Sequence, residues 1–159
     1  MLVLSSCKKS ETGSGNENAE PIDTFSYTVI DGVNWGNFNE GAVAGDIYGN
    51  EYTYSAATSA CPDGWRLPTK DEFAALEGKD WGEYMGAQGL WLNMYYNEKI
   101  FLPCFKKNAS AELKSGAYWT STETGKQGIY YACEINSDEE VNFTEIDGGD
   151  LCSVRCIKK

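Results

Sequence analysis

The chain divides into a polar N-terminal segment and a longer segment in which apolar and polar positions alternate. Residues 8–23 contain one isoleucine and no other large apolar side chain. We expect them to form a flexible tether, because so little apolar burial cannot offset the entropy lost on ordering. From residue 24 onward, short runs rich in β-branched and aromatic residues alternate with Gly, Asn and Asp, as is typical of strands joined by turns. The pattern predicts one folded domain over residues 24–159.

Two helices are expected in the first half of this domain. A short helix is predicted from Tyr52 to Ala60 and ends before Pro62-Asp63-Gly64. Thr69 and Glu72 have the spacing of a capping box, in which each side chain bonds an unpaired backbone N–H at the start of a helix. The second helix is therefore expected to begin after Thr69 and to end near Gly78.

Most of the remaining apolar runs favour strands. The expected strands cover residues 25–30, 33–35, 90–96, 99–105, 117–121, 128–135, 140–146 and 151–157, the last three as a C-terminal meander. Asp31-Gly32 between the first two is a strong hairpin-turn signal. Helices early and strands late indicate the α+β class.

The composition excludes several classes of function. The chain has 24 acidic and 13 basic side chains, and its net charge of −11 argues against a nucleic-acid partner. It has no histidine, which excludes Ser-His-Asp and Cys-His catalytic groups and His-ligated zinc. No apolar run approaches the ~18 residues of a membrane-spanning helix. We therefore expect a protein that is not an enzyme and needs no cofactor.

The first seven residues resemble the end of a bacterial lipoprotein signal. Leu4-Ser5-Ser6-Cys7 resembles a lipobox, in which two small residues precede the cysteine that receives the lipid. The apolar stretch before Cys7 is shorter than the ~7–15 residues of a signal-peptide core, so residues 1–7 are interpreted as a truncated signal. The alternative is a chance apolar start with an ordinary cysteine. The resemblance implies that the lipid on Cys7 is the only membrane attachment, in an outer-membrane lipoprotein that is surface-exposed or periplasmic.

Several motifs occur in the same order as those of one known family. They are Ile30-Asp-Gly-Val-Asn-Trp35, Gly49-Asn-Glu-Tyr-Thr-Tyr54, Cys61-Pro-Asp-Gly-Trp-Arg-Leu-Pro-Thr69, Ile100-Phe-Leu-Pro103, Tyr118-Trp-Thr-Ser-Thr-Glu123 and Ser153-Val-Arg-Cys156. With these motifs the chain resembles the Fibrobacter succinogenes major paralogous domain, a family abundant in lipoproteins of Bacteroidetes and Fibrobacteres. The resemblance implies a C-type-lectin-like fold, with two short helices, a small twisted antiparallel sheet and long loops.

Two of these motifs contain the only arginines, Arg66 and Arg155. A planar guanidinium can bind backbone carbonyls or a carboxylate. We interpret both arginines as structural, with contact to a ligand as the alternative. Gly64 is expected to adopt a positive φ in a tight turn that places Trp65 under the sheet.

Five cysteines lie in the expected domain, and an exported chain would form disulfides. The resemblance implies a bridge between Cys61 and Cys156. Among the other three, hairpin geometry slightly favours Cys133 with Cys152, and Cys104 with Cys133 is a close competitor. With either pairing, one of these three cysteines would remain as an unpaired thiol.

Acidic side chains are one group of binding candidates. Seven acids and no base lie between Gly128 and Val154, and we interpret them as a solvated surface. Asp147 and Asp150 are the candidates for a weak calcium site. However, the Glu-Pro-Asn and Gln-Pro-Asp signatures of calcium-dependent sugar-binding lectins are absent, and Asp147-Gly-Gly-Asp150 is better interpreted as a hairpin turn.

Aromatic side chains are the stronger group of binding candidates, because exposed rings favour sugar stacking or protein contact. Trp91, Tyr95, Tyr96, Tyr118 and Trp119 lie on expected strands whose two faces cannot all be buried. The family resemblance implies that Trp119 lies in the core, because Trp-Thr-Ser-Thr is similar to an inner strand of that family. Tyr95, Tyr96 and Tyr118 are therefore the ligand candidates.

These observations favour a lipid-anchored, C-type-lectin-like binding module that recognises glycan or protein at the cell surface. A structural envelope or fimbria-associated subunit without a small ligand is the main alternative. A remote alternative comes from Cys152-x-x-x-Cys156, because formylglycine-generating enzymes share a related fold and bind copper with a closely spaced cysteine pair.

Overall fold

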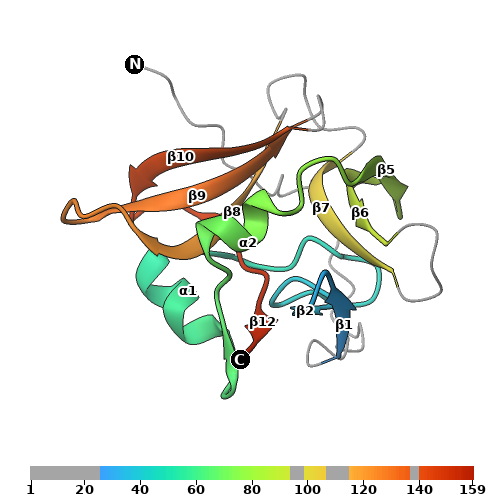
Figure 1. Cartoon of the computed structure of the whole chain (residues 1–159), viewed down its shortest axis with the longest axis horizontal. Helices are drawn as coiled ribbons and strands as arrows, with labels where there is room; N and C mark the ends of the chain where they lie inside the picture. The colour runs from blue at the N-terminus through green and yellow to red at the C-terminus, as the bar shows by residue number, and fades with distance from the viewer. Residues whose placement is uncertain (1–25, 94–98, 107–114, 137–139) are drawn as a thin grey trace.

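The strands in the described part of the chain form three sheets, with two short helices beside them (Figure 1). This computed structural model describes residues 26–93, 99–106, 115–136 and 140–159. Of these residues, 49% lie in strands and 11% in helices. The fold is therefore mainly β, and the expectation of an α+β, C-type-lectin-like fold was wrong.

A four-stranded sheet has the order β1-β2-β12-β4. Its strands are β1 (Tyr27–Ile30), β2 (Val33–Gly36), β12 (Ile157–Lys158) and β4 (Trp65–Arg66). The predicted hairpin between β1 and β2 is confirmed, and the two turn residues Asp31-Gly32 both have positive φ. β12 lies between β2 and β4, so that β4 joins this sheet only through β12.

A five-stranded sheet has the order β10-β9-β8-β11-β3. Its strands are β10 (Val141–Asp147), β9 (Ile129–Asn136), β8 (Ser115–Glu123), β11 (Cys152–Ser153) and β3 (Glu51–Tyr52). The predicted hairpin of β9 and β10 is confirmed. The predicted third strand of the meander is wrong. β11 does not pair with β10. It pairs in parallel with β8, whose other neighbour is β9, and the chain then continues into β12 of the four-stranded sheet.

A three-stranded sheet has the order β5-β6-β7. Its strands are β5 (Asp80–Tyr84), β6 (Ala87–Leu92) and β7 (Ile100–Lys106), and all neighbours are antiparallel. β5 was not predicted from the sequence. The turn Met85-Gly86 joins β5 to β6, and both turn residues have positive φ, as a two-residue hairpin turn of this kind requires.

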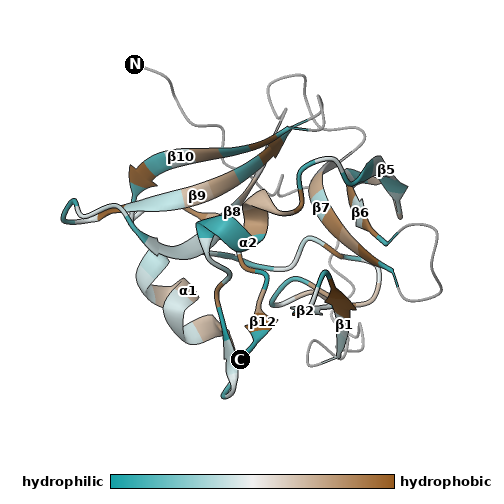
Figure 2. Cartoon of the chain, viewed as in Figure 1, coloured by the Kyte–Doolittle hydropathy of each residue, from teal (hydrophilic) through white to brown (hydrophobic). Residues whose placement is uncertain are grey.

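Both helices are shorter than predicted. α1 (Tyr54–Ala60) begins after Thr53, because the preceding residues pair with β11 as strand β3. α2 (Lys70–Ala74) has the predicted capping box, and only its first residues are hydrophilic (Figure 2). After Ala74 the chain continues to Gly78 as turns, in which the N–H groups of Leu76 and Glu77 donate to carbonyls three residues earlier.

The core consists of two large clusters of buried side chains, one on each face of the five-stranded sheet. The first contains Trp35 and Phe73, whose ring centroids are 5.4 Å apart. The second contains Trp65 and Trp119. The prediction that Trp65 lies buried after a turn with positive φ at Gly64 is confirmed, and so is the burial of Trp119.

Candidate functional site

The structure describes one of the three predicted ligand residues and places it in the core. Tyr118 is fully buried, where its hydroxyl donates to the carbonyl of Pro103 at 2.6 Å and accepts from the amide of Asn39 at 3.2 Å. A side chain without exposed surface cannot contact a ligand, so this prediction was wrong. Tyr95 and Tyr96 lie outside the described residues, as does the predicted lipidation site Cys7.

The cysteines are only partly as predicted. The bridge between Cys61 and Cys156 is present, with Cα atoms 5.8 Å apart. Cys104, Cys133 and Cys152 are buried thiols. Burial raises the pKa of the Cys133 thiol far above its ordinary value, which keeps it protonated and unreactive. Because Cys156 is bridged to Cys61, it cannot supply the thiolate that a copper site with Cys152 would need.

The favoured pairing of Cys133 with Cys152 was wrong for a topological reason. Cys133 on β9 faces Tyr118 on β8, and Ser153 on β11 also faces Tyr118 from the other side. Strand β8 therefore separates the two cysteines by about 10 Å, beyond the ~7 Å that a bridge can span. They also belong to different core clusters, one on each face of the sheet.

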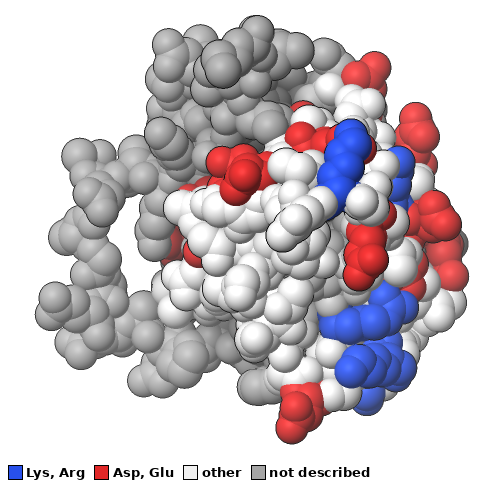
Figure 3. Space-filling model, turned by 90° about the vertical axis from the view of Figure 1, so that its left-hand side faces the viewer, with Lys and Arg blue, Asp and Glu red and all other residues white. Residues whose placement is uncertain are grey.

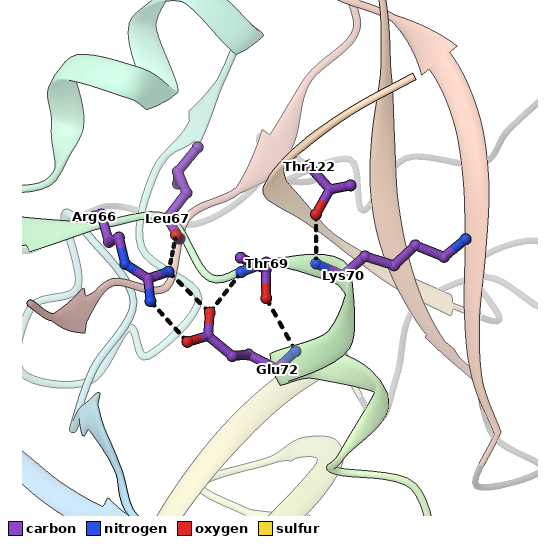
Figure 4. Close-up of polar contacts among 6 residues, drawn as sticks. All are labelled: Arg66, Leu67, Thr69, Lys70, Glu72 and Thr122. Carbon is purple, nitrogen blue, oxygen red and sulfur yellow. Dashed lines mark hydrogen bonds and ion pairs between the residues drawn. The ribbon is translucent and has the colours of Figure 1, made fainter. Parts of the chain in front are cut away.

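Arg66 has the structural role that its motif predicted. Its guanidinium forms a bidentate ion pair with the carboxylate of Glu72, with N···O distances of 2.8 and 2.7 Å. It also donates to the carbonyl of Leu67 (Figure 4). Burial alone would raise the pKa of Glu72. Hydrogen bonds from Arg66 and Thr69 outweigh this effect and hold that pKa below its ordinary value. The pair therefore fixes the start of α2 against β4.

Arg155 is also structural, and it is nearly completely buried. Its Nε donates to Asn39 at 2.8 Å, and its two terminal nitrogens donate to the carbonyls of Gly36 and Phe101 at 2.9 and 2.7 Å. Burial lowers its pKa, yet a guanidinium stays charged at any physiological pH. The charge of Arg155 in turn opposes the burial that raises the pKa of Glu40. Arg155 thus joins the end of β2 to β7.

The acidic C-terminal region forms turns and ion pairs. The Asp147 carboxylate accepts from Gly149, and the backbone N–H of Asp150 donates to the carbonyl of Asp147, which closes a turn. This turn is not a hairpin, because β10 and β11 are not paired. Glu145 forms an ion pair with Lys126, and on the face in Figure 3 basic side chains lie among the acidic ones. Within the described ranges, no group of three acidic or thiol side chains could hold a metal ion.

A pocket lies where the three-stranded sheet meets the segment that follows β2. Its volume is about 300 Å³. Three rings on β5, β6 and β7 form its aromatic side: Trp91 and Phe101 have centroids 4.9 Å apart, and Tyr84 packs edge-on against both, at 5.3 and 5.7 Å. Phe38, Ile47 and Ile100 also belong to the apolar lining. Tyr84 is 40% exposed, so the aromatic cluster is open to solvent.

Two facing glycines make room for these rings. Gly82 on β5 is opposite Gly89 on β6. A Cβ on Gly82 would lie 3.1 Å from the indole of Trp91, and one on Gly89 would lie 2.7 Å from the ring of Phe101 and 2.1 Å from a backbone carbonyl oxygen. Glycine inside a strand marks such a close approach. These glycines were the signal in the sequence that could have located the pocket.

The polar groups of the pocket are few. Among the described residues, Lys99, Asn37 and Arg155 line it, and no acidic side chain does. The Nζ of Lys99 lies 5.2 Å from the centroid of the Trp91 ring, within the range of a cation–π contact. The amide of Asn37 is fixed, because it accepts from Thr28 and donates to Ser26.

Comparisons of the chain with models of protein families, with curated proteins and with solved structures found no match. In the part of the chain that the structure describes, no helix has the length and apolar character needed to span a membrane. The pocket is therefore the feature that indicates a function.

Proposed function

We propose that this protein is a lipid-anchored binding module that binds a glycan at the bacterial cell surface. The observation that carries the proposal is the cluster of Tyr84, Trp91 and Phe101 beside a pocket of about 300 Å³. This volume is at the lower end of the range for small-molecule sites, which suits one end of a glycan rather than a long stretch of it.

The arrangement of the rings suits a sugar. The apolar C–H face of a sugar ring packs against an aromatic face, while its hydroxyl groups need a few polar partners. Trp91 is half-buried and held by Phe101 from one side, so little side-chain entropy would be lost on binding. Phe101 rests on a small buried cluster with Ile47 and Ala87, which gives the pocket a rigid floor.

Features outside the pocket support the proposed location. The resemblance of Leu4–Cys7 to a lipobox and the polar segment at residues 8–23 suit an anchored and displayed domain. The bridge between Cys61 and Cys156 suits an oxidising compartment. The order of the motifs supports membership of the major paralogous domain family, which is abundant in bacterial lipoproteins.

A glycan array with the purified chain, followed by titration of each hit, tests the proposal. We expect the Trp91→Ala variant to lose binding at least tenfold, because the central ring of the cluster is gone. Tyr27→Ala is the matched control, because Tyr27 is a 43% exposed ring on a different sheet. Equal loss in both variants, or no binding to any glycan, would contradict a glycan site in this pocket. Mass analysis of the mature N-terminus would test lipidation of Cys7.

Strand β1 favours a second candidate, a structural subunit of the envelope. It is an edge strand among the described residues, and its Tyr27 and Val29 are 43% and 51% exposed on one face. An exposed apolar edge can pair with another chain. Cross-linking in intact cells would give a fixed high-mass ladder if this candidate is correct, and a charged residue in place of Val29 should abolish that ladder.

A further inference from the structure

The charges around the aromatic pocket are opposite in sign to those of the whole chain. The chain has a net charge of −11, yet the described charged residues that line the pocket are two cations, Lys99 and Arg155. The nearby acid Glu83 precedes Tyr84 on β5 and so projects from the other face of the sheet, where it accepts from Gln88. The pocket therefore has a positive local character.

Lys99 takes part in none of the ion pairs that stabilise the described fold. Three other cations of the described chain have acidic partners, in the pairs Arg66–Glu72, Lys79–Asp31 and Lys126–Glu145. Lys99 is exposed and makes no ion pair with any described residue. Its ammonium group lies instead over the ring of Trp91, at the side of the pocket. An acidic chain thus presents an ammonium group that has no acidic partner among the described residues beside the aromatic cluster of the pocket.

Arg155 contributes in a different way. It is 1% exposed and has three acceptors in the protein, so it cannot bind a ligand directly. Its fixed charge lies behind the pocket, and the partly buried Glu40 offsets part of that charge. Because low polarity around a buried charge strengthens its field, Arg155 still favours an anion in the pocket.

We propose that the pocket binds a sugar ring that carries an anionic group, with the ring against Trp91 and the anion at Lys99. This inference rests on the proposed function and adds the chemical class of its ligand. A carboxylate, as in a uronic acid, and a sulfate ester both supply the required anion. Salt dependence is part of the proposal, because an exposed ion pair is screened by added salt.

Calorimetric titration of the full chain with matched oligosaccharides tests the inference. The probes are glucuronic-acid-terminated, glucose-6-sulfate-terminated and glucose-terminated sugars of equal length. We expect at least one acidic probe to bind about fivefold or more tightly than the glucose probe at low salt, the order of one exposed ion pair. That advantage should disappear at 0.5 M salt, where the Debye length is only about 4–5 Å. The two acidic probes identify which anion is preferred.

Variants separate this inference from the proposed function. Lys99→Met should reduce binding of the acidic probes to the level at which the same variant binds the neutral probe, and Lys99→Arg should restore the preference. Lys158→Met is the matched control, because Lys158 also lies over an exposed ring, that of Tyr27, at 4.6 Å. Equal binding of acidic and neutral probes, or no effect of Lys99→Met, would overturn the inference while the glycan site stands. Absence of binding to all three probes would also overturn the inference, whereas the proposed function fails only if no glycan on the array binds.

Discussion

The bridge between Cys61 and Cys156 should supply a large part of the stability of this domain. It joins residues separated by 95 positions, because it links the end of α1 to the segment between β11 and β12. In the chain-entropy model a loop of that length contributes about 4.7 kcal/mol to the free energy of unfolding. Typical domains have a total of about 5–15 kcal/mol. We therefore expect the double variant Cys61→Ala/Cys156→Ala to be only marginally folded.

A control must separate the loss of the bridge from the loss of buried sulfur. Cys152 is suitable, because it is as buried as Cys156, at 2% exposure, and lies in the same core cluster. A buried thiol behaves as a small apolar group, so Cys152→Ala should cost about 1–2 kcal/mol. Any larger loss in the double variant is then due to the closed loop.

Urea unfolding followed by tryptophan fluorescence, without reductant, measures both effects. The midpoint should fall strongly in the double variant, and the slope of the free energy against urea should rise, because the unfolded chain is no longer held compact by the bridge. A loss of less than about 1.5 kcal/mol with an unchanged slope would refute the reasoning, because the bridge would then not restrict the unfolded state.

Two further predictions concern the pocket sheet and the start of α2. Gly89→Ala would place a methyl group 2.1 Å from the carbonyl oxygen of Leu102, so urea unfolding should show a loss of about 1–3 kcal/mol or more; a neutral result would contradict this close approach. Glu72→Gln removes a carboxylate whose pKa the fold lowers from 4.5, through its bonds with Arg66 and Thr69. The native carboxylate stabilises the fold above that ordinary value and loses its effect as pH falls through the lowered pKa. The difference in the free energy of unfolding between wild type and variant should therefore have its full value at pH 7 and decrease below pH ~4.5. A difference that does not change with pH would contradict the assignment.

Local signals in the sequence located local structure well. The capping box at Thr69 and Glu72, the turn at Asp31-Gly32 and the turn before Trp65 each depend on a few neighbouring residues, and all three were predicted. The Cys61–Cys156 bridge came from a resemblance rather than from geometry, and it is present. The structural roles of both arginines also followed from their chemistry.

The arrangement of the sheets could not be predicted, because it depends on pairings between distant segments. Tyr52 was expected to begin a helix, and it lies in strand β3 instead, because it pairs with Cys152 of β11 a hundred residues later. The favoured thiol pair failed for the same reason, since the order β9-β8-β11 is not visible in the local pattern.

The candidate site was only partly visible in the sequence. Trp91 belonged to the aromatic candidates, but its partners Tyr84 and Phe101 come from other strands. Strand β5, which provides Tyr84, was missed because three of its five residues, Asp80, Gly82 and Glu83, are of types depleted in strands. Only the assembled sheet brings these rings together with Lys99.

The position of β11 and β12 has a consequence for how the polypeptide is made. β3 joins its sheet only through β11, and β4 joins its sheet only through β12. β11 and β12 are the last strands in chain order, and Cys156, one half of the bridge, lies between them. During synthesis, neither sheet can be completed until residues 152–158 emerge from the ribosome, because long-range pairings wait for their latest member. Until then the chain has neither the bridge nor the strands that hold β3 and β4, although pairings among earlier strands, such as β1 with β2 and β9 with β10, can already form.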